Sequence, residues 1–166
     1  MIQRKQSLYM LLGVVCLVLF ALLPMFTFNA ADSSMRLYTY GFALSEGGDN
    51  YALTEGVNLR SLCMIALTAI AGVVMLVNIF LFRRRELQLS ILMAEYALLI
   101  GIVAFGAYYV WFFGDTYAST IPTGSALTNV PGWSLCLPFV ALLTNYLAVR
   151  GVASDIALLR SIDRIR

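Results

Sequence analysis

Histidine is absent from the sequence, and charged residues are scarce. None of the 166 residues is a histidine, and only 12% are Asp, Glu, Lys or Arg, about half of the share that is usual in soluble domains. Without an imidazole, the chain has no histidine base, histidine metal ligand or axial haem histidine. So few charges cannot cover a soluble surface of this size, and we expect lipid to surround much of the chain.

Cysteine is also sparse. Cys16, Cys63 and Cys136 stand alone, without a C-x-x-C pair, which argues against a thiol oxidoreductase with vicinal cysteines. We expect no catalytic cysteine and no disulfide between Cys63 and Cys136. The apolar segments also lack paired carboxylates, so acid–base and metal chemistry have few groups to use. We therefore predict no enzymatic activity, no cofactor, no metal site and no nucleic-acid partner.

What the sequence does contain is four long stretches with few or no charges. They begin after Lys5, Arg60, Arg85 and Asp115, and each is long enough for the roughly 20 apolar residues that cross a bilayer. Only helices fit such stretches, because lipid offers the backbone no hydrogen-bond partners. We predict an all-α membrane protein, a single domain (residues 1–166) with four transmembrane helices at about 7–29, 60–82, 88–113 and 133–150.

The basic residues predict the orientation of this four-helix bundle. Nine of the eleven Lys and Arg residues lie at the N-terminus, in the short loop with Arg83, Arg84 and Arg85, or from Arg150 to the C-terminus. Short basic loops stay cytoplasmic, so both termini are predicted inside (N-in/C-in). An alternative role for the three loop arginines is contact with anionic lipid. Trp111 and Trp133 then fall at the outer interface, where tryptophan is enriched.

The segments outside the spans differ in character. In the first outer loop, residues 30–59, the stretch "MRLYTYGFAL" is followed by turn residues "SEGGDN" and then "YALTEGV". This pattern predicts a β-hairpin, with Arg36, Tyr38, Tyr40 and Phe42 on one face. The second outer loop, residues 114–132, is predicted to be irregular, so that the two loops form a small cap.

The tail, residues 152–166, is predicted to be an amphipathic helix that extends the fourth span or lies on the inner leaflet.

Small residues suggest how the helices pack. Ala94, Ala97, Gly101 and Ala104 recur at helical spacing in the third span, and Ala66, Ala69 and Gly72 recur in the second. Small residues let helices approach closely in lipid, so both rows are predicted to be packing surfaces.

Three polar residues inside the spans form the candidate site, namely Asn78, Glu95 and Asn145. Their positions allow them to gather in the inner half of the bundle, and an intramembrane carboxylate is a functional-site hypothesis. Three interpretations of Glu95 stay open. It lies at the headgroup level near the arginines, it belongs to a structural polar cluster, or it is a proton or ligand site.

The two ends of the chain resemble a known family. Ile2-Gln3-Arg4 before the first span and the run Arg160–Arg164 are similar to the termini of a family of small four-span membrane proteins of Bacteroidota, catalogued as domain of unknown function 4293. The resemblance covers the whole chain. It implies four spans in the inner membrane, and it brings no activity and no site residues.

These observations favour a non-catalytic accessory or scaffold protein of the bacterial inner (cytoplasmic) membrane. Its expected partners are the lipid bilayer and another membrane or cytoplasmic protein that binds residues 152–166. The alternative is a component that binds or transports a lipid or a small amphiphile, with a polar site near Glu95. A cavity that ends at Glu95 favours the alternative, and a close-packed bundle favours the scaffold.

Overall fold

The computed structural model describes residues 3–30, 33–46, 52–53, 58–81, 84–120 and 128–163. Over these residues the chain forms four α-helices, one short 3-10 helix and a five-stranded antiparallel sheet. The helices are α1 (Gln3–Leu22), α2 (Leu59–Phe80), α3 (Arg85–Thr120) and α4 (Leu137–Asp163), and the 3-10 helix η1 (Trp133–Cys136) precedes α4. The strands are β1 (Phe26–Asn29), β2 (Ser33–Tyr38), β3 (Gly41–Glu46), β4 (Ala52–Leu53) and β5 (Thr128–Pro131).

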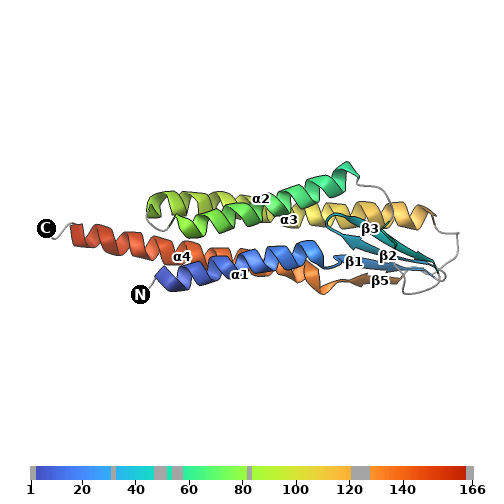
Figure 1. Ribbon diagram of the computed structural model, residues 1–166, viewed down its shortest axis with the longest axis horizontal. Helices are drawn as coiled ribbons and strands as arrows, with labels where there is room; N and C mark the ends of the chain where they lie inside the picture. The colour runs from blue at the N-terminus through green and yellow to red at the C-terminus, as the bar shows by residue number, and fades with distance from the viewer. Residues whose placement is uncertain are drawn as a thin grey trace.

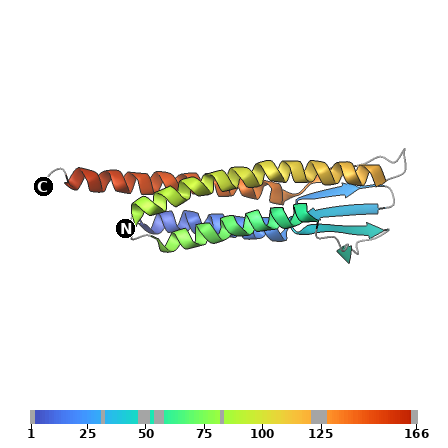
Figure 2. The ribbon, with the colours of Figure 1, turned by 90° about the horizontal axis from the view of Figure 1, so that it is seen from above.

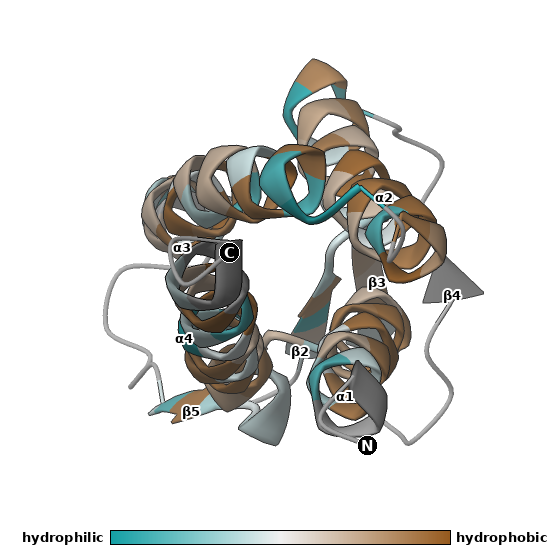
Figure 3. Ribbon diagram, turned by 90° about the vertical axis from the view of Figure 1, so that its left-hand side faces the viewer, coloured by the Kyte–Doolittle hydropathy of each residue, from teal (hydrophilic) through white to brown (hydrophobic). Residues whose placement is uncertain are grey.

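The molecule is long and narrow, with the sheet at one end and both chain termini at the other (Figures 1 and 2). Helix α1 packs against α2 and α4, and α3 packs against the same two helices. The end-on view in Figure 3 shows this four-membered ring, in which hydrophobic ribbon predominates on every helix. Each helix therefore has two neighbours and one outward side.

Buried residues recur along α2, and along α3 as far as Phe113, at alternating spacings of three and four. This repeat is the pattern of helices that pack side by side at a small crossing angle. On α2 the buried residues are Ser61, Met64, Thr68, Ala71, Met75 and Asn78. On α3 they are Gln88, Leu92, Glu95, Leu99, Ile102, Gly106, Tyr109, Phe113 and Tyr117. Large hydrophobic side chains are exposed on the outward sides of all four helices, as in a bundle that lipid surrounds.

The prediction that the small residues form the packing surfaces was wrong. Ala94, Ala97 and Ala104 are exposed on α3, and Ala66 and Ala69 are exposed on α2. In α3 the buried stripe lies beside this row and contains the polar residues. Hydrophobic residues occur all round α3, so hydrophobicity alone does not distinguish the inward face. The polar residues do, because they have no hydrogen-bond partner in lipid.

Three helical segments among the described residues are long and apolar enough to cross a membrane: Leu59–Phe80, Arg85–Ala118 and Trp133–Leu158. Gln6–Leu22 is a shorter apolar helix. The first span was predicted to reach residue 29, but α1 ends at Leu22 and residues 26–29 form β1. Pro24 explains this boundary, since proline lacks the N–H that a helix needs and disfavours helix in the residue before it.

The cap is more ordered than the sequence indicated. The sheet has the order β4-β3-β2-β1-β5, so the second outer loop, predicted to be irregular, contributes a strand. The hairpin exists, but its tight turn lies at Thr39 and Tyr40, inside the stretch predicted to be a single strand. This turn moves Phe42 off the predicted common face, because Phe42 pairs with Leu37 across the hairpin rather than with Tyr38.

Helix α3 extends beyond the other helices at this end and carries the sheet (Figure 1). The ring of Phe28 lies 6.2 Å from that of Tyr117, and the ring of Phe42 lies 5.7 Å from that of Phe113. The Tyr109 hydroxyl lies 3.1 Å from the backbone oxygen of Tyr38 and can donate a hydrogen bond to it. The apolar face of the sheet therefore rests on the last turns of α3.

The residue before β1 and the residue after β5 are in close backbone contact. The Gly132 N–H donates to the Met25 carbonyl over 2.9 Å, and the Ser134 hydroxyl donates to the Pro24 carbonyl over 2.6 Å. A Cβ atom at Gly132 would lie 2.3 Å from the Pro24 carbonyl oxygen. Only glycine fits there, and these bonds fasten the start of α4 to the end of α1.

We predict that Gly132→Ala destabilises the protein by about 1–3 kcal/mol, since the added methyl group meets backbone that cannot move aside without strain. Unfolding of the purified protein in detergent, followed by tryptophan fluorescence, measures the effect. Gly41→Ala is the matched control, because a Cβ atom there meets no atom within 4 Å. Equal stability of the two variants would contradict the prediction.

Candidate functional site

The three predicted polar residues all lie in the core. Asn78 of α2, Glu95 of α3 and Asn145 of α4 are each 0% exposed. They occupy the buried stripes of their helices, so their side chains are directed into the bundle. The structure thus places Glu95 inside the protein and away from its lipid-facing surface.

Asn78 pairs with a residue that the sequence analysis did not single out. Its side-chain nitrogen donates to the Gln88 carbonyl over 3.4 Å, and the Gln88 side-chain nitrogen donates to the Asn78 carbonyl over 3.4 Å. The Gln88 amide also lies 3.9 Å from the sulfur of Met10. A signal for Gln88 was present, because it precedes Glu95 by seven residues and so shares its helix face.

Asn145 reaches α3 one turn further along. Its side-chain nitrogen donates to the Leu92 carbonyl over 3.2 Å. Glu95 follows Leu92 by three residues, and helix side chains lean towards the N-terminus of their own helix. The Glu95 carboxyl is therefore directed towards the level of Asn145. Asn78, opposite Gln88, lies about 10 Å further along the α3 axis.

These residues leave four buried oxygen atoms without a hydrogen-bond donor. Among the described residues, no donor reaches either carboxyl oxygen of Glu95 or the side-chain oxygens of Asn78 and Asn145. All four atoms are acceptors. Buried polar groups are almost always hydrogen-bonded, and a buried acceptor without a donor costs about 1–3 kcal/mol.

The arginines of the inner loop have different surroundings. Arg84 is exposed, and an Nη atom of Arg85 lies 3.8 Å from an Asp155 carboxylate oxygen. Arg83 lies outside the described residues. The same Asp155 oxygen accepts a hydrogen bond from the Gln6 side chain over 3.0 Å. Asp155 is buried, and its two partners come from α1 and α3, so the first turn of the predicted tail belongs to the bundle.

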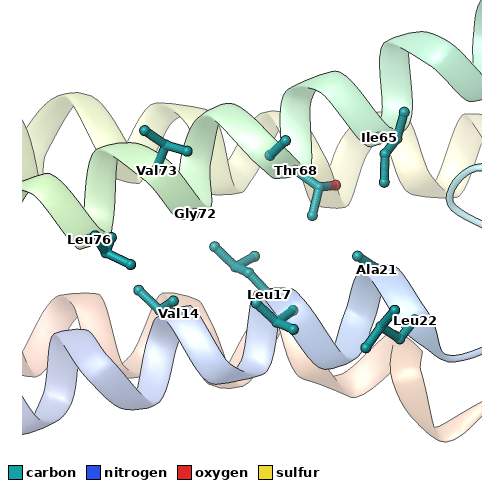
Figure 4. Close-up of a pocket in the computed structure, with 11 residues that line it drawn as sticks. Val14, Leu17, Ala21, Leu22, Ile65, Thr68, Gly72, Val73 and Leu76 are labelled. Atoms are coloured by element: carbon teal, nitrogen blue, oxygen red, sulfur yellow. The ribbon is translucent and has the colours of Figure 1, made fainter.

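A groove runs between α1 and α2 on the outside of the bundle (Figure 4). It has a volume of about 380 Å³. Its lining is almost wholly apolar, because the hydroxyl of Thr68 bonds to the Met64 carbonyl of its own helix. On the α2 side, Gly72 and Ala69 leave room for the groove because they have little or no side chain. Val14, Leu17 and Ala21 are among the residues of the opposite side. Glu95 does not line it.

The outer end carries an aromatic patch. The guanidinium of Arg60 lies 3.7 Å from the centre of the Phe112 ring, and its Nε donates to the Tyr108 hydroxyl over 3.4 Å. The rings of Tyr38 and Tyr40 stack at 5.2 Å. Desolvation and the neighbouring Tyr38 raise the pKa of the Tyr40 hydroxyl above its ordinary value. Arg60 is therefore held by aromatic contacts at the base of the cap.

The described part of the chain holds no group of three Cys, Asp or Glu side chains arranged to bind a metal ion. Cys16 is buried, Cys63 and Cys136 are exposed, and all three are free thiols. The chemistry available to the candidate site is therefore that of one carboxyl group and its amide neighbours.

Asp155→Ala is predicted to lower stability by about 1–3 kcal/mol, because it leaves the buried Gln6 amide without its acceptor and removes the Arg85 contact. Thermal unfolding in detergent tests this, with the exposed neighbour Ser154→Ala as the control. If Asp155→Ala unfolds at the same temperature as the control, the contacts of Asp155 contribute nothing to the bundle.

Comparison with known proteins gives one family. No curated protein matches the sequence. The family model described as Domain of unknown function (DUF4293) matches residues 2–165, which is nearly the whole chain. The protein is therefore a member of the DUF4293 family.

Proposed function

We propose that this chain is a four-span protein of the bacterial inner membrane, with both termini inside, and that it serves as a non-catalytic accessory or scaffold protein. Four antiparallel helices with both termini at one end support an even number of crossings (Figure 2). The apolar outward sides of the helices support lipid as their surroundings.

The short first helix supports this arrangement. Helix α1 has 20 residues and is about 30 Å long; its apolar part is Gln6–Leu22, and the basic residues of its first turn suit the membrane surface. Large hydrophobic side chains are exposed from Leu8 to Leu22. A soluble helix would place polar residues on such a face, so α1 is suited to lipid contact.

The ends of the bundle support the orientation. The exposed Arg84 and Arg150 lie towards the end with the termini, and basic residues favour the cytoplasmic side. Trp111 and Trp133, which are 68% and 91% exposed, lie towards the sheet, as expected for the interfacial belt.

The observation that carries the scaffold proposal is that two helices extend past the bundle, one at each end. Helix α3 continues outward and carries the sheet, and α4 continues past the other helices at the end with the termini (Figure 1). The outer sheet and the inner projection of α4 each offer a surface that the bundle leaves uncovered, with Leu158 exposed on the projection. A protein built this way is suited to holding partners on either side of the membrane.

A second candidate function is lipid binding, and the α1–α2 groove favours it. The groove is apolar and extends along α2 from Ile65 to Leu76, and such an elongated apolar site suits one acyl chain. For the lipid-binding alternative, the sequence predicted a ligand site near Glu95. The groove instead lies on the outer surface of the bundle, so the lipid hypothesis now rests on Gly72 and Ala69.

Single cysteines, placed in a protein whose native cysteines are replaced, test the predicted topology. A cysteine at the exposed Asn129 of β5 should react with a membrane-impermeant maleimide in intact spheroplasts. A cysteine at the exposed Arg84 should react only after lysis, because basic loops stay inside. The reverse labelling would contradict the orientation, and labelling of both positions would contradict a four-span bundle.

Purification from native membranes in mild detergent distinguishes the two functions. The scaffold hypothesis predicts a stoichiometric protein partner that is lost when residues 158–166 are deleted, with Asp155 and its contacts left in place. The lipid hypothesis predicts a bound lipid that is lost in Gly72→Leu. A Cβ atom at Gly72 meets no atom within 4 Å, so a side chain can start there, and leucine extends it into the groove.

Gly72→Ala controls for helix propensity, because alanine adds a single methyl group. The truncated protein must unfold at the wild-type temperature for its loss of a partner to count. A partner that stays with the truncated chain would overturn the role of the tail. Lipid that is retained equally by the leucine and alanine variants would overturn the groove.

A further inference from the structure

The two buried carboxyl groups of the described core differ in their hydrogen-bond partners. Asp155 accepts a hydrogen bond from the Gln6 amide and lies 3.8 Å from the Arg85 guanidinium. Glu95 is more deeply buried, and the described residues supply no donor to either of its oxygens. A carboxylate without a partner is costly to bury, so the surroundings of Glu95 are incomplete.

The neighbouring Asn145 does not complete them. Its side-chain nitrogen donates to the Leu92 carbonyl and does not reach either Glu95 oxygen, and within the described chain the Asn145 oxygen accepts nothing. Among the described residues, this layer of the bundle therefore holds three acceptor atoms without a donor, namely the two Glu95 carboxyl oxygens and the Asn145 amide oxygen. A cation, or a proton bound to the carboxyl group, satisfies acceptors of this kind.

Other charged groups lie too far away. Arg85 precedes Glu95 by ten residues, about 15 Å along the helix, and it is paired with Asp155. On the buried stripes of the neighbouring helices, the titratable side chains are Cys16 of α1 and Asp155 of α4, and the stripe of α2 has none from Ser61 to Asn78. No described cation on these stripes balances Glu95.

We propose that Glu95 and Asn145 form an internal binding site for one monovalent cation, which is a proton or an alkali-metal ion. One carboxylate matches one positive charge. A bound proton turns the carboxyl group into a donor, with the Asn145 oxygen as an acceptor within the same layer of the bundle. A bound alkali-metal ion takes the same oxygens as ligands, since hard cations prefer carboxylate and carbonyl oxygen.

The polar residues of the core indicate the side from which the cation arrives. Between Glu95 and the end with the termini, the core contains the Asn78–Gln88 pair and then the Gln6–Asp155 pair. On the other side, the buried stripe of α3 continues with Leu99 and Ile102. A cation that exchanges with the end that carries the termini passes these polar pairs. A cation that exchanges with the cap end passes Leu99, Ile102 and Thr68 of α2, whose hydroxyl is bonded to its own helix.

Thermal unfolding of the purified protein tests the proposal. The wild type and Glu95→Gln are compared in sodium, potassium and choline chloride at one ionic strength, over a series of pH values. The alkali-metal form predicts that sodium or potassium raises the wild-type unfolding temperature above that in choline at fixed pH, by at least about 3 °C. The proton form predicts a pH response of the wild type in choline that Glu95→Gln lacks, because its amide binds no proton.

Three further variants keep the test decisive. Glu86→Gln removes an exposed carboxyl group from the same helix, and Cys16→Ala removes the thiol of the α1 stripe. Both should respond as the wild type does. Asn145→Leu keeps Glu95 but removes one acceptor, so it should weaken the response even if Glu95→Gln does not accumulate. The proposal is overturned if Glu95→Gln or Asn145→Leu responds to pH and to each cation as the wild type does.

Discussion

Lipid offers polar side chains no hydrogen-bond partners, and this constraint decides which face of each helix turns inward. Hydrophobic residues occur all round α3, and its exposed side includes Met93, Ile100 and Trp111. Its inward side contains Gln88 and Glu95 on the same stripe as Leu92 and Leu99. The stripe with the polar groups is the buried one, because only there do they meet other protein groups. The position of the polar residues thus fixes the rotation of the helix.

The same constraint explains the order of contacts at the inner end. Gln6, Gln88 and Asp155 come from α1, α3 and α4. The Gln6 side chain donates to Asp155, and the Gln88 side chain donates to the Asn78 carbonyl of α2. Gly151 allows this packing, since a Cβ atom there would lie 2.9 Å from the Gln6 side chain. Polar contacts with small residues beside them therefore define the register of the helices more sharply than apolar packing does.

At the end with the sheet, the surroundings of α3 change. Once α3 leaves the bundle, aromatic rings of the sheet cover its last turns, and Gly114 leaves room for the ring of Phe28. Strand β1 begins directly after Met25, at the end of α1, and β5 ends directly before Gly132, which leads into η1 and α4. The sheet is thus an extension of the helical frame rather than a separate unit.

The sequence predicted those parts of the fold that depend on one stretch of chain at a time. Gaps between charges located the helices, and alternation with turn residues indicated a hairpin in the first outer loop. The end of α1 was misplaced because Phe26–Asn29 is as apolar as a helix end, and its strand partner Thr128–Pro131 lies about a hundred residues away. The face of α3 was misassigned because small residues were given more weight than Gln88 and Glu95. The Gln6–Asp155 contact joins the two ends of the chain, and no local pattern reveals such a pair.

Glu95 is the residue that packing alone explains least. A leucine or glutamine at its position would remove an unpartnered buried carboxyl group, and the bundle already has polar pairs that set its register. Its surroundings on α3 are firmly held: Asn145 bonds to the Leu92 carbonyl one turn before it, and Tyr109 lies two heptads after it, bonded to Ser61 of α2. The helix that carries Glu95 is thus held at both sides, and it also carries the outer sheet. Phe113 and Tyr117, further along the same stripe, pack against the sheet rings of Phe42 and Phe28, so the buried face that holds Glu95 is the face that supports the cap.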